Sequence, residues 1–356
     1  MKPIRLQIPT QEIRKPDIRK QSLAELTQFL QTQGEKSFRA KQIYQWIWQK
    51  SAHSFEQMSN LSQKLRDLLS QHYAFYPLAV AKTQQSEDGT IKSAFKLDGG
   101  HLVEGVLIPA PPRMTACISS QVGCSLSCKF CATGYMDKKR NIDAAEIYDQ
   151  VVAIQRQAEA HFNLPLSNIV FMGMGEPLMN YQNVLKGIEM LTSPDGLNMS
   201  PKRITVSTAG IAKFIKKLGD DEVKFNLALS LHAANDEKRN QIMPINDSNN
   251  LAVLREALMY FYQKTKNRIT YEYIMFDDFN DSLKDAEELF RFTKHTPCRV
   301  NIIEYNPISE AEFRKPSEAR IDAFAAYLVK KGVMATVRRS RGKDIDAACG
   351  QLANKG

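Results

Sequence analysis

Three cysteines, Cys124, Cys128 and Cys131, have the residue type and the spacing for specific metal chemistry. Their C-x3-C-x2-C pattern lets each thiolate bind one iron of a cubane four-iron four-sulfur cluster, and no fourth cysteine follows within a few residues. The fourth iron then lacks a protein ligand, and an open metal position is typical of a site that binds substrate. A tetrahedral zinc site is the alternative, but it requires a further Cys or His close by, which this stretch does not provide.

Residues at the ends of predicted strands form a second candidate set. The carboxyl ends of parallel strands share one edge of a sheet, where ligands bind, so we expect these residues to surround the cysteine loop. Any one of them could instead be a helix cap or a turn residue. The set comprises Gly175, Glu176, Ser207, Ser230, Leu231, His232 and Asn306.

Two more cysteines and a glutamate are candidates for covalent and acid–base chemistry. Cys349 lies in a basic, glycine-flanked stretch near the chain end, which favours a mobile, exposed thiol of lowered pKa, although an incidental surface thiol fits as well. Cys117 lies on an apolar strand, where a buried small hydrophobe is the default interpretation, as for Cys298. Glu104 lies within another apolar strand and is either a general base or half of a structural ion pair.

The elements that must position these residues alternate between strands and helices. Strand-like runs occupy residues 115–119, 168–173, 203–207, 224–230, 269–276 and 298–305, and periodic apolar residues typical of helices follow them, as at 144–160 and 285–293. Six such units predict an α/β fold with a parallel sheet, curved into a partial (β/α)6 barrel or left open. A last run at 333–339 is expected to add an edge strand.

The region before this body predicts a smaller piece of different character. Residues 1–20 are polar and basic and indicate an N-terminal arm, and 21–76 show three helical patterns that predict a small helical accessory domain. Residues 77–109 predict strands that bridge to the core. The core then covers 110–345, and 346–356 form a C-terminal tail that carries Cys349.

Composition limits the function classes. The 356 residues carry a net charge of +9 and 43% hydrophobic residues, which allows a large core and indicates a polyanionic partner such as nucleic acid. The start lacks an apolar signal-like segment and no run of eighteen apolar residues occurs, so no membrane association is expected. Six cysteines in a chain of this length do not indicate a secreted disulfide framework, and we expect a cytoplasmic protein.

Five segments together resemble the RlmN family of the radical S-adenosylmethionine superfamily. They are residues 117–124, 128–134, 173–180, 243–246 and 344–352, and they occur in order along the chain. The resemblance runs from the front helices to the last residues. It implies a radical S-adenosylmethionine barrel and a dual-specificity methyltransferase that acts on carbon 2 of adenine in 23S rRNA, at the peptidyl-transferase centre, and of the adenine next to the anticodon in tRNA.

The resemblance also implies a role for each candidate. Cys124, Cys128 and Cys131 would hold one [4Fe-4S] cluster whose open iron binds S-adenosylmethionine, with two molecules of S-adenosylmethionine used per turnover. The remaining ligands of S-adenosylmethionine would be Gly175 and Glu176 for the methionine amino group, Ser207 for the carboxylate or ribose side, Ser230, Leu231 and His232 for the ribose, and Asn306 for adenine.

The covalent steps follow from the same resemblance. Cys349 would take a methyl group from one S-adenosylmethionine, and the deoxyadenosyl radical from a second would remove a hydrogen from that S-methyl group so that its carbon adds to the base. Glu104 would then take the carbon 2 proton, and Cys117 would attack the Cys349 sulfur, releasing product and leaving a transient disulfide. An electron donor and a disulfide reductant are therefore expected partners besides rRNA and tRNA, and we expect a monomer.

Basic residues next to the two reactive loops could contact RNA phosphates, although each could equally be solvated surface charge. Those nearest are Lys138, Lys139, Arg140, Arg338, Arg339, Arg341 and Lys343. Two other functions compete with the carbon 2 methyltransferase. One is a Cfr-like enzyme that methylates carbon 8 of the rRNA adenine, and the other is a non-catalytic RNA-binding protein with a structural metal.

Overall fold

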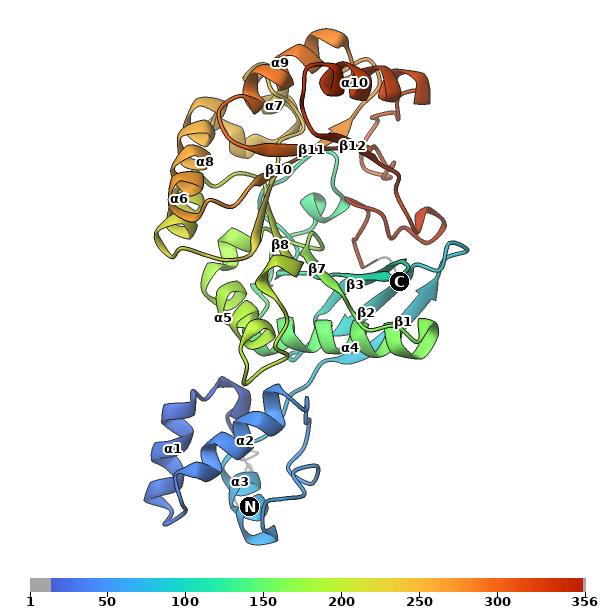
Figure 1. Cartoon of the computed structure of the whole chain (residues 1–356). Helices are drawn as coiled ribbons and strands as arrows, with labels where there is room; N and C mark the ends of the chain where they lie inside the picture. The colour runs from blue at the N-terminus through green and yellow to red at the C-terminus, as the bar shows by residue number, and fades with distance from the viewer. Residues whose placement is uncertain (1–13, 355–356) are drawn as a thin grey trace, which may run out of the picture. The chain divides into compact units, whose positions relative to one another are not determined.

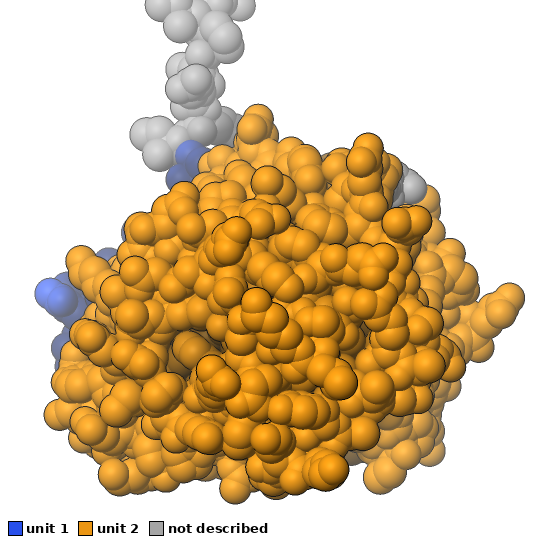
Figure 2. Space-filling view, turned by 90° about the horizontal axis from the view of Figure 1, so that it is seen from above, with its two compact units in different colours: residues 1–77 blue, residues 78–356 orange. Residues whose placement is uncertain are grey.

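The computed structural model describes residues 14–354, so most of the predicted N-terminal arm and the last two residues of the tail lie outside the described part. The chain divides into two compact units, residues 1–77 and 78–356, which Figure 2 colours separately. The predicted change of character near residue 77 therefore coincides with the end of the first unit.

The first unit is a small helical bundle. Its helices are α1 (Leu23–Thr32), α2 (Phe38–Trp48) and α3 (Gln63–His72). The side chains of Ser22 and Ser62 accept hydrogen bonds from backbone amides in the first turns of α1 and α3, which fixes where these helices begin. Leucines and isoleucines at helical spacing are buried between them, namely Leu26, Leu30, Ile43, Ile47, Leu65 and Leu69.

The second unit is built on one ten-stranded sheet. Seven of its strands run parallel: β4 (Arg113–Cys117), β7 (Asn168–Phe171), β8 (Ile204–Thr208), β9 (Asn226–Ser230), β10 (Ile269–Met275), β11 (Cys298–Glu304) and β12 (Ala335–Arg338). Three strands extend it antiparallel beyond β4: β1 (Ala79–Gln85), β2 (Ile91–Lys96) and β3 (Leu102–Ala110). The predicted parallel strands and the predicted edge strand are all present.

Helices connect and cover the parallel strands. They are α4 (Ala144–Phe162), α5 (Tyr181–Thr192), α6 (Ala212–Asp220), α7 (Asp236–Ile242), α8 (Leu251–Thr265), α9 (Leu283–Thr293) and α10 (Glu318–Lys330). Figure 1 shows them on the outer side of the curved sheet, while the C-terminal segment, in red, lies on the inner side. The sheet does not close, because β1 and β12 each pair with a single neighbour. The predicted partial barrel is therefore confirmed.

Strands β1 to β3 were predicted to bridge to the core, but they are part of the core sheet itself. β3 pairs antiparallel with β4, so residues 79–110 continue the core sheet. A two-residue pair, β5 (Gln121–Val122) with β6 (Arg140–Asn141), encloses the cysteine loop between its strands. The loop thus leaves the sheet at the carboxyl end of β4 and returns near the start of α4.

Candidate functional site

A cavity opens at the carboxyl ends of the parallel strands. The space between its walls is about 950 Å³ when the open solvent at its mouth is included. Segments that are far apart in the sequence line its wall: the cysteine loop, the ends of β7 to β11, the end of α7 and the C-terminal tail. The predicted site residues on this wall are Cys124, Cys128, Cys131, Gly175, Glu176, Ser207, Ser230, His232 and Cys349.

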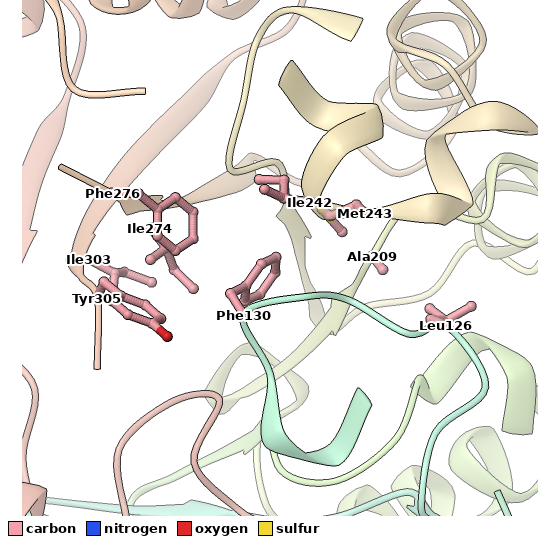
Figure 3. Packing of buried hydrophobic residues seen from close by; sticks show 9 residues of the cluster. All are labelled: Leu126, Phe130, Ala209, Ile242, Met243, Ile274, Phe276, Ile303 and Tyr305. Carbon is pink, nitrogen blue, oxygen red and sulfur yellow. The ribbon is translucent and has the colours of Figure 1, made fainter. Parts of the chain in front are cut away.

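The cysteine loop is held by apolar side chains that alternate with the cysteines. Leu126 and Phe130 are buried in a cluster that also contains Ile242 and Met243 from the end of α7, and Figure 3 shows Phe130 between that end and the ends of β10 and β11. The Lys129 amide donates to the Ile242 carbonyl oxygen at 3.0 Å. These contacts anchor the loop against α7, and the three cysteines pack against the same apolar cluster.

The donor set fits a cubane cluster. Burial raises the pKa of the Cys124 thiol to about 11 and raises the pKa values of Cys128 and Cys131 as well, so the thiolates form only when a cation compensates their charge. Within residues 14–354, no three His, Cys, Asp or Glu side chains are grouped as the ligands of a metal ion. In a cubane cluster the three thiolates bind three different irons. The three sulfur atoms therefore do not need to converge on a single point.

Gly175 and Glu176 form the wall after β7. Gly175 has φ of +91°, and a Cβ atom there would collide with the Gln121 side chain, so only glycine fits this position. The Glu176 carboxylate accepts from the amides of Leu178 at 3.0 Å and Ala209 at 2.7 Å. Burial is the largest influence on Glu176 and raises its pKa, which a bound ammonium group would counteract.

The ends of β8 and β9 contribute hydroxyl groups and an imidazole. The Ser207 and Ser230 hydroxyl oxygens lie 3.3 Å apart. His232 accepts a hydrogen bond from the Ile274 amide at Nδ1 (3.1 Å), and burial lowers its pKa to about 3. His232 is therefore a neutral imidazole at physiological pH, and its ring lies edge-on to Phe130 with 4.7 Å between the centroids.

Two predicted ligands of S-adenosylmethionine lie behind the cavity wall. The Leu231 side chain is fully buried, and its amide donates to the Glu272 carbonyl oxygen at 3.0 Å. Asn306 follows β11 and donates from Nδ2 to the Ser340 hydroxyl at 2.9 Å. The side chains of these two residues do not line the cavity, so only their backbone or a rearrangement could bring them to a ligand there.

The C-terminal tail is docked on the cysteine loop. The Ala132 amide donates to the Gly350 carbonyl oxygen at 2.7 Å, and the Thr133 hydroxyl donates to the Leu352 carbonyl oxygen at 2.5 Å. These bonds place Cys349 on the cavity wall. The expectation of a mobile, exposed thiol of lowered pKa is wrong for this state, because Cys349 is half-buried and burial raises its pKa despite the nearby Arg338.

Cys117 and Glu104 lie outside the cavity wall, on β4 and β3. Cys117 is buried at the end of β4, where burial and the nearby Cys349 raise its pKa to about 12. The Glu104 carboxylate lies 3.6 Å from the Lys92 ammonium and accepts from the amides of Ala353 and Asn354 at 2.9 and 3.1 Å. In this state Glu104 forms the ion pair that was its alternative interpretation and holds the tail.

Sequence reasoning missed two charged residues next to the site. Glu272 of β10 lines the cavity, and its carboxylate lies 3.5 Å from the Arg338 guanidinium. The positive charge of Arg338 acts to lower the pKa values of Cys117 and Cys349. Arg239 of α7 is fully buried behind the wall. Glu272 stands alone among apolar strand residues, as Glu104 does, so the argument applied to Glu104 could have found it. Arg239 had no comparable signal.

The comparisons with known proteins agree with this geometry. The model of the Radical SAM superfamily matches residues 118–292, which hold the cysteine loop and the ends of β7 to β10. The chain is thus a radical S-adenosylmethionine enzyme, whose cofactors are a [4Fe-4S] cluster and S-adenosylmethionine. The model of the ribosomal RNA large subunit methyltransferase N-terminal domain matches residues 17–74, in the first unit.

Relatives identify the family within that class. A probable dual-specificity RNA methyltransferase RlmN from Cytophaga hutchinsonii is 60% identical over 98% of this chain and 96% of its own. The dual-specificity RNA methyltransferase RlmN from Pelobacter propionicus is 44% identical over 96% of both chains. A solved radical SAM methyltransferase from Sphaerobacter thermophilus superposes with a TM-score of 0.89 and 41% identity, covering 95% of this chain and 99% of its own. The chain belongs to the RlmN family.

Family membership confirms the predicted resemblance, enzyme class and cofactors. The individual residue roles remain predictions. In the described part of the chain, no helix has the length and apolar character needed to cross a lipid bilayer.

Proposed function

We propose that this enzyme methylates carbon 2 of a specific adenine in 23S rRNA and of the adenine next to the anticodon in tRNA, with Cys349 as the methyl carrier. The observation that supports this proposal most directly is that Cys349 lies on the wall of the same cavity as Cys124, Cys128 and Cys131. A carrier sulfur must reach both the methyl donor and the source of the radical, and this placement allows both.

The cofactors are held by residues on that wall and close behind it. Cys124, Cys128 and Cys131 hold the cluster. The ligands of S-adenosylmethionine are Gly175, Glu176, Ser207, Ser230, Leu231, His232 and Asn306. The bound cluster and S-adenosylmethionine supply a 5′-deoxyadenosyl radical. The neutral His232 imidazole and the Ser207 and Ser230 hydroxyl groups can form hydrogen bonds to a ribose without adding charge to the cavity.

Cys349 is a nucleophile towards the methyl sulfonium group. Its thiol loses its proton to solvent, the sulfur takes the methyl group as the S–CH3 bond of the sulfonium breaks, and the neutral thioether S-adenosylhomocysteine leaves. The positive sulfonium together with Arg338 offsets the cost of forming a thiolate in a half-buried position. The S-methyl carbon then points into the cavity, where the target base must enter. Since a base stacked in RNA cannot reach this depth, the nucleotide is turned out of its stack.

Cys117 completes the reaction. Its thiolate attacks the Cys349 sulfur, and the bond between that sulfur and the carbon attached to the base breaks with its electron pair on the carbon. The carbon takes a proton to become the methyl group, and a Cys117–Cys349 disulfide remains. An external dithiol reduces the disulfide and restores both thiols. The charge of Cys349 contributes to the raised pKa of Cys117, which supports a short path between the two sulfur atoms.

Glu104 is the proposed base for the carbon 2 proton. To act on the substrate it must exchange its bonds with the amides of Ala353 and Asn354 for a bond to the base. Release of these amides would also free the tail segment that carries Cys349. One movement of residues 349–354 would therefore serve both Cys349 and Glu104.

The chain divides this work among its parts. We assign RNA binding to the accessory domain (21–76) and to basic residues beside the reactive loops, catalysis to the core (110–345) with its adjoining strands (77–109), and methyl transfer to the tail (346–356). Arg140 is the least available of these basic residues, because both of its terminal nitrogens bind the Glu146 carboxylate, at 2.7 and 2.6 Å. A cytoplasmic monomer, with an electron donor and a thiol reductant as partners, completes the proposal.

Mass spectrometry of nucleosides from RNA treated with the reconstituted enzyme tests the proposal. We expect 2-methyladenosine in 23S rRNA and in tRNA, formed only when S-adenosylmethionine and a reductant are present. Formation of 8-methyladenosine alone would instead establish the Cfr-like reaction. The high identity to curated RlmN relatives across nearly the whole chain favours carbon 2.

A further inference from the structure

One cation of the second unit is buried without a carboxylate partner. Arg239 on α7 has 0% of its surface exposed, and it forms no ion pair with any residue of the described range 14–354. A charge removed from water in this way is costly unless something nearby compensates it. The groups that surround the Arg239 guanidinium therefore indicate the role of its positive charge.

The guanidinium group links the ends of two strands that form the cavity wall. Nη2 donates to the carbonyl oxygen of Ala209, after β8, at 2.6 Å, and Nε donates to that of Leu231, after β9, at 3.1 Å. Nη1 donates to the Asn246 side-chain oxygen at 2.5 Å. Nη2 also donates to the Ser230 carbonyl oxygen at 3.4 Å. All four acceptors are neutral, so these bonds satisfy the donors but place no carboxylate in contact with the guanidinium.

The cysteine loop packs against the helix that carries Arg239, α7. The Lys129 amide, next to Cys128, donates to the carbonyl oxygen of Ile242, one turn after Arg239 in α7. Cys128 packs against the apolar cluster that contains Ile242. The charges of Arg239 and Cys128 also influence each other, because the guanidinium lowers the pKa of the thiol and the thiolate raises that of the guanidinium.

We propose that Arg239 is a positioning residue for the cavity wall whose buried charge favours the reduced state of the cluster bound by Cys124, Cys128 and Cys131. The inference rests on the proposed function, since it requires that cluster. Reduction places one further electron, from a low-potential donor, on a site that already carries three thiolates. A positive charge in a water-poor environment stabilises the added negative charge more than an exposed one does, and neighbouring charge is known to set cluster potentials.

The reduction midpoint of the cluster tests the proposal. It is measured by redox titration of anaerobically reconstituted full-length protein, monitored by electron paramagnetic resonance. We expect Arg239→Gln to make reduction at least tenfold less favourable, a fall of about 59 mV for one electron. Arg239→Lys keeps the charge and should remain within threefold of the wild type. A glutamine variant that holds the cluster with an unchanged midpoint would overturn the proposal, as would a lysine variant shifted as far as glutamine.

Lys129 provides the matched control. It adjoins Cys128 but is exposed, so solvent screens its charge, and Lys129→Gln should shift the equilibrium less than threefold. A shift as large as that of Arg239→Gln would refute a special effect of the buried charge.

Asp236 provides an independent test with the opposite sign. Burial lowers the pKa of Arg239 to about 10, and the negative charges of Cys128 and Asp236 counteract this effect. The Asp236 carboxylate accepts from Asn246 Nδ2 at 2.8 Å. Asp236→Asn should therefore raise the midpoint. If Arg239→Gln fails to fold, this variant decides, and an unchanged or lowered midpoint sinks the proposal. Wild-type protein that takes up no cluster would contradict the proposed function instead.

Discussion

Cys124→Ala is expected to remove the cluster and with it all cleavage of S-adenosylmethionine. The loop supplies three thiolates, and a cubane bound through two would expose a second iron to solvent. Because loss of an outer-shell partner alone costs 10–100-fold in metal affinity or activity, we expect loss of a ligand to lower cleavage by more than about 100-fold. The fold should persist, since Leu126 and Phe130 still anchor the loop.

Iron and sulfide content, the visible spectrum and release of 5′-deoxyadenosine measure this effect. Cys298→Ala is the matched control, because this cysteine is half-buried at the start of β11 and does not line the cavity. The control should keep the full cluster and full cleavage. A Cys124→Ala protein that retains a four-iron cluster and cleaves S-adenosylmethionine would contradict the assignment of Cys124.

Cys117→Ala is expected to leave the protein covalently attached to its RNA. Without the Cys117 thiol, nothing attacks the Cys349 sulfur, so the thioether between Cys349 and the base persists. The enzyme therefore does not release its RNA. The substitution removes only a small side chain at the end of β4, and burial of its neighbours should keep the site intact. We therefore expect formation of the adduct without multiple turnover.

Denaturing electrophoresis with labelled RNA, followed by mass analysis of the digested adduct, detects the trapped complex. The double variant with Cys117→Ala and Cys349→Ala should form no adduct, which shows that Cys349 carries the link. Release of methylated RNA in multiple turnovers by the single variant would exclude the role given to Cys117.

The regular part of the fold could be predicted because it depends on local patterns. Apolar runs in β8 to β11 and periodic apolar residues in α4 and α9 were sufficient to place these elements, since strands buried on both faces and amphipathic helices have distinct periods. The parallel order brings the strand ends to one edge of the sheet, and Gly175, Glu176, Ser207 and His232 line the cavity there together with the cysteine loop.

The remainder depended on contacts between distant segments. Basic, glycine-flanked sequence around Cys349 indicated a mobile tail, but bonds from Ala132 and Thr133 dock it on the cysteine loop. No local pattern reveals such a partner. Arg239 was missed for the same reason: on a short helix a lone arginine indicates solvent exposure, and only the strand-end carbonyl groups of Ala209 and Leu231 explain its burial.

The central claim is that a sulfur atom of the C-terminal tail carries the methyl group in the cavity of the cluster. Peptide mass analysis of protein purified from its host tests this claim most directly. We predict that the peptide containing Cys349 has the mass of one added methyl group, located on that sulfur by fragmentation. An unmodified Cys349 in fully active protein, or a methyl group on another cysteine, would contradict the account.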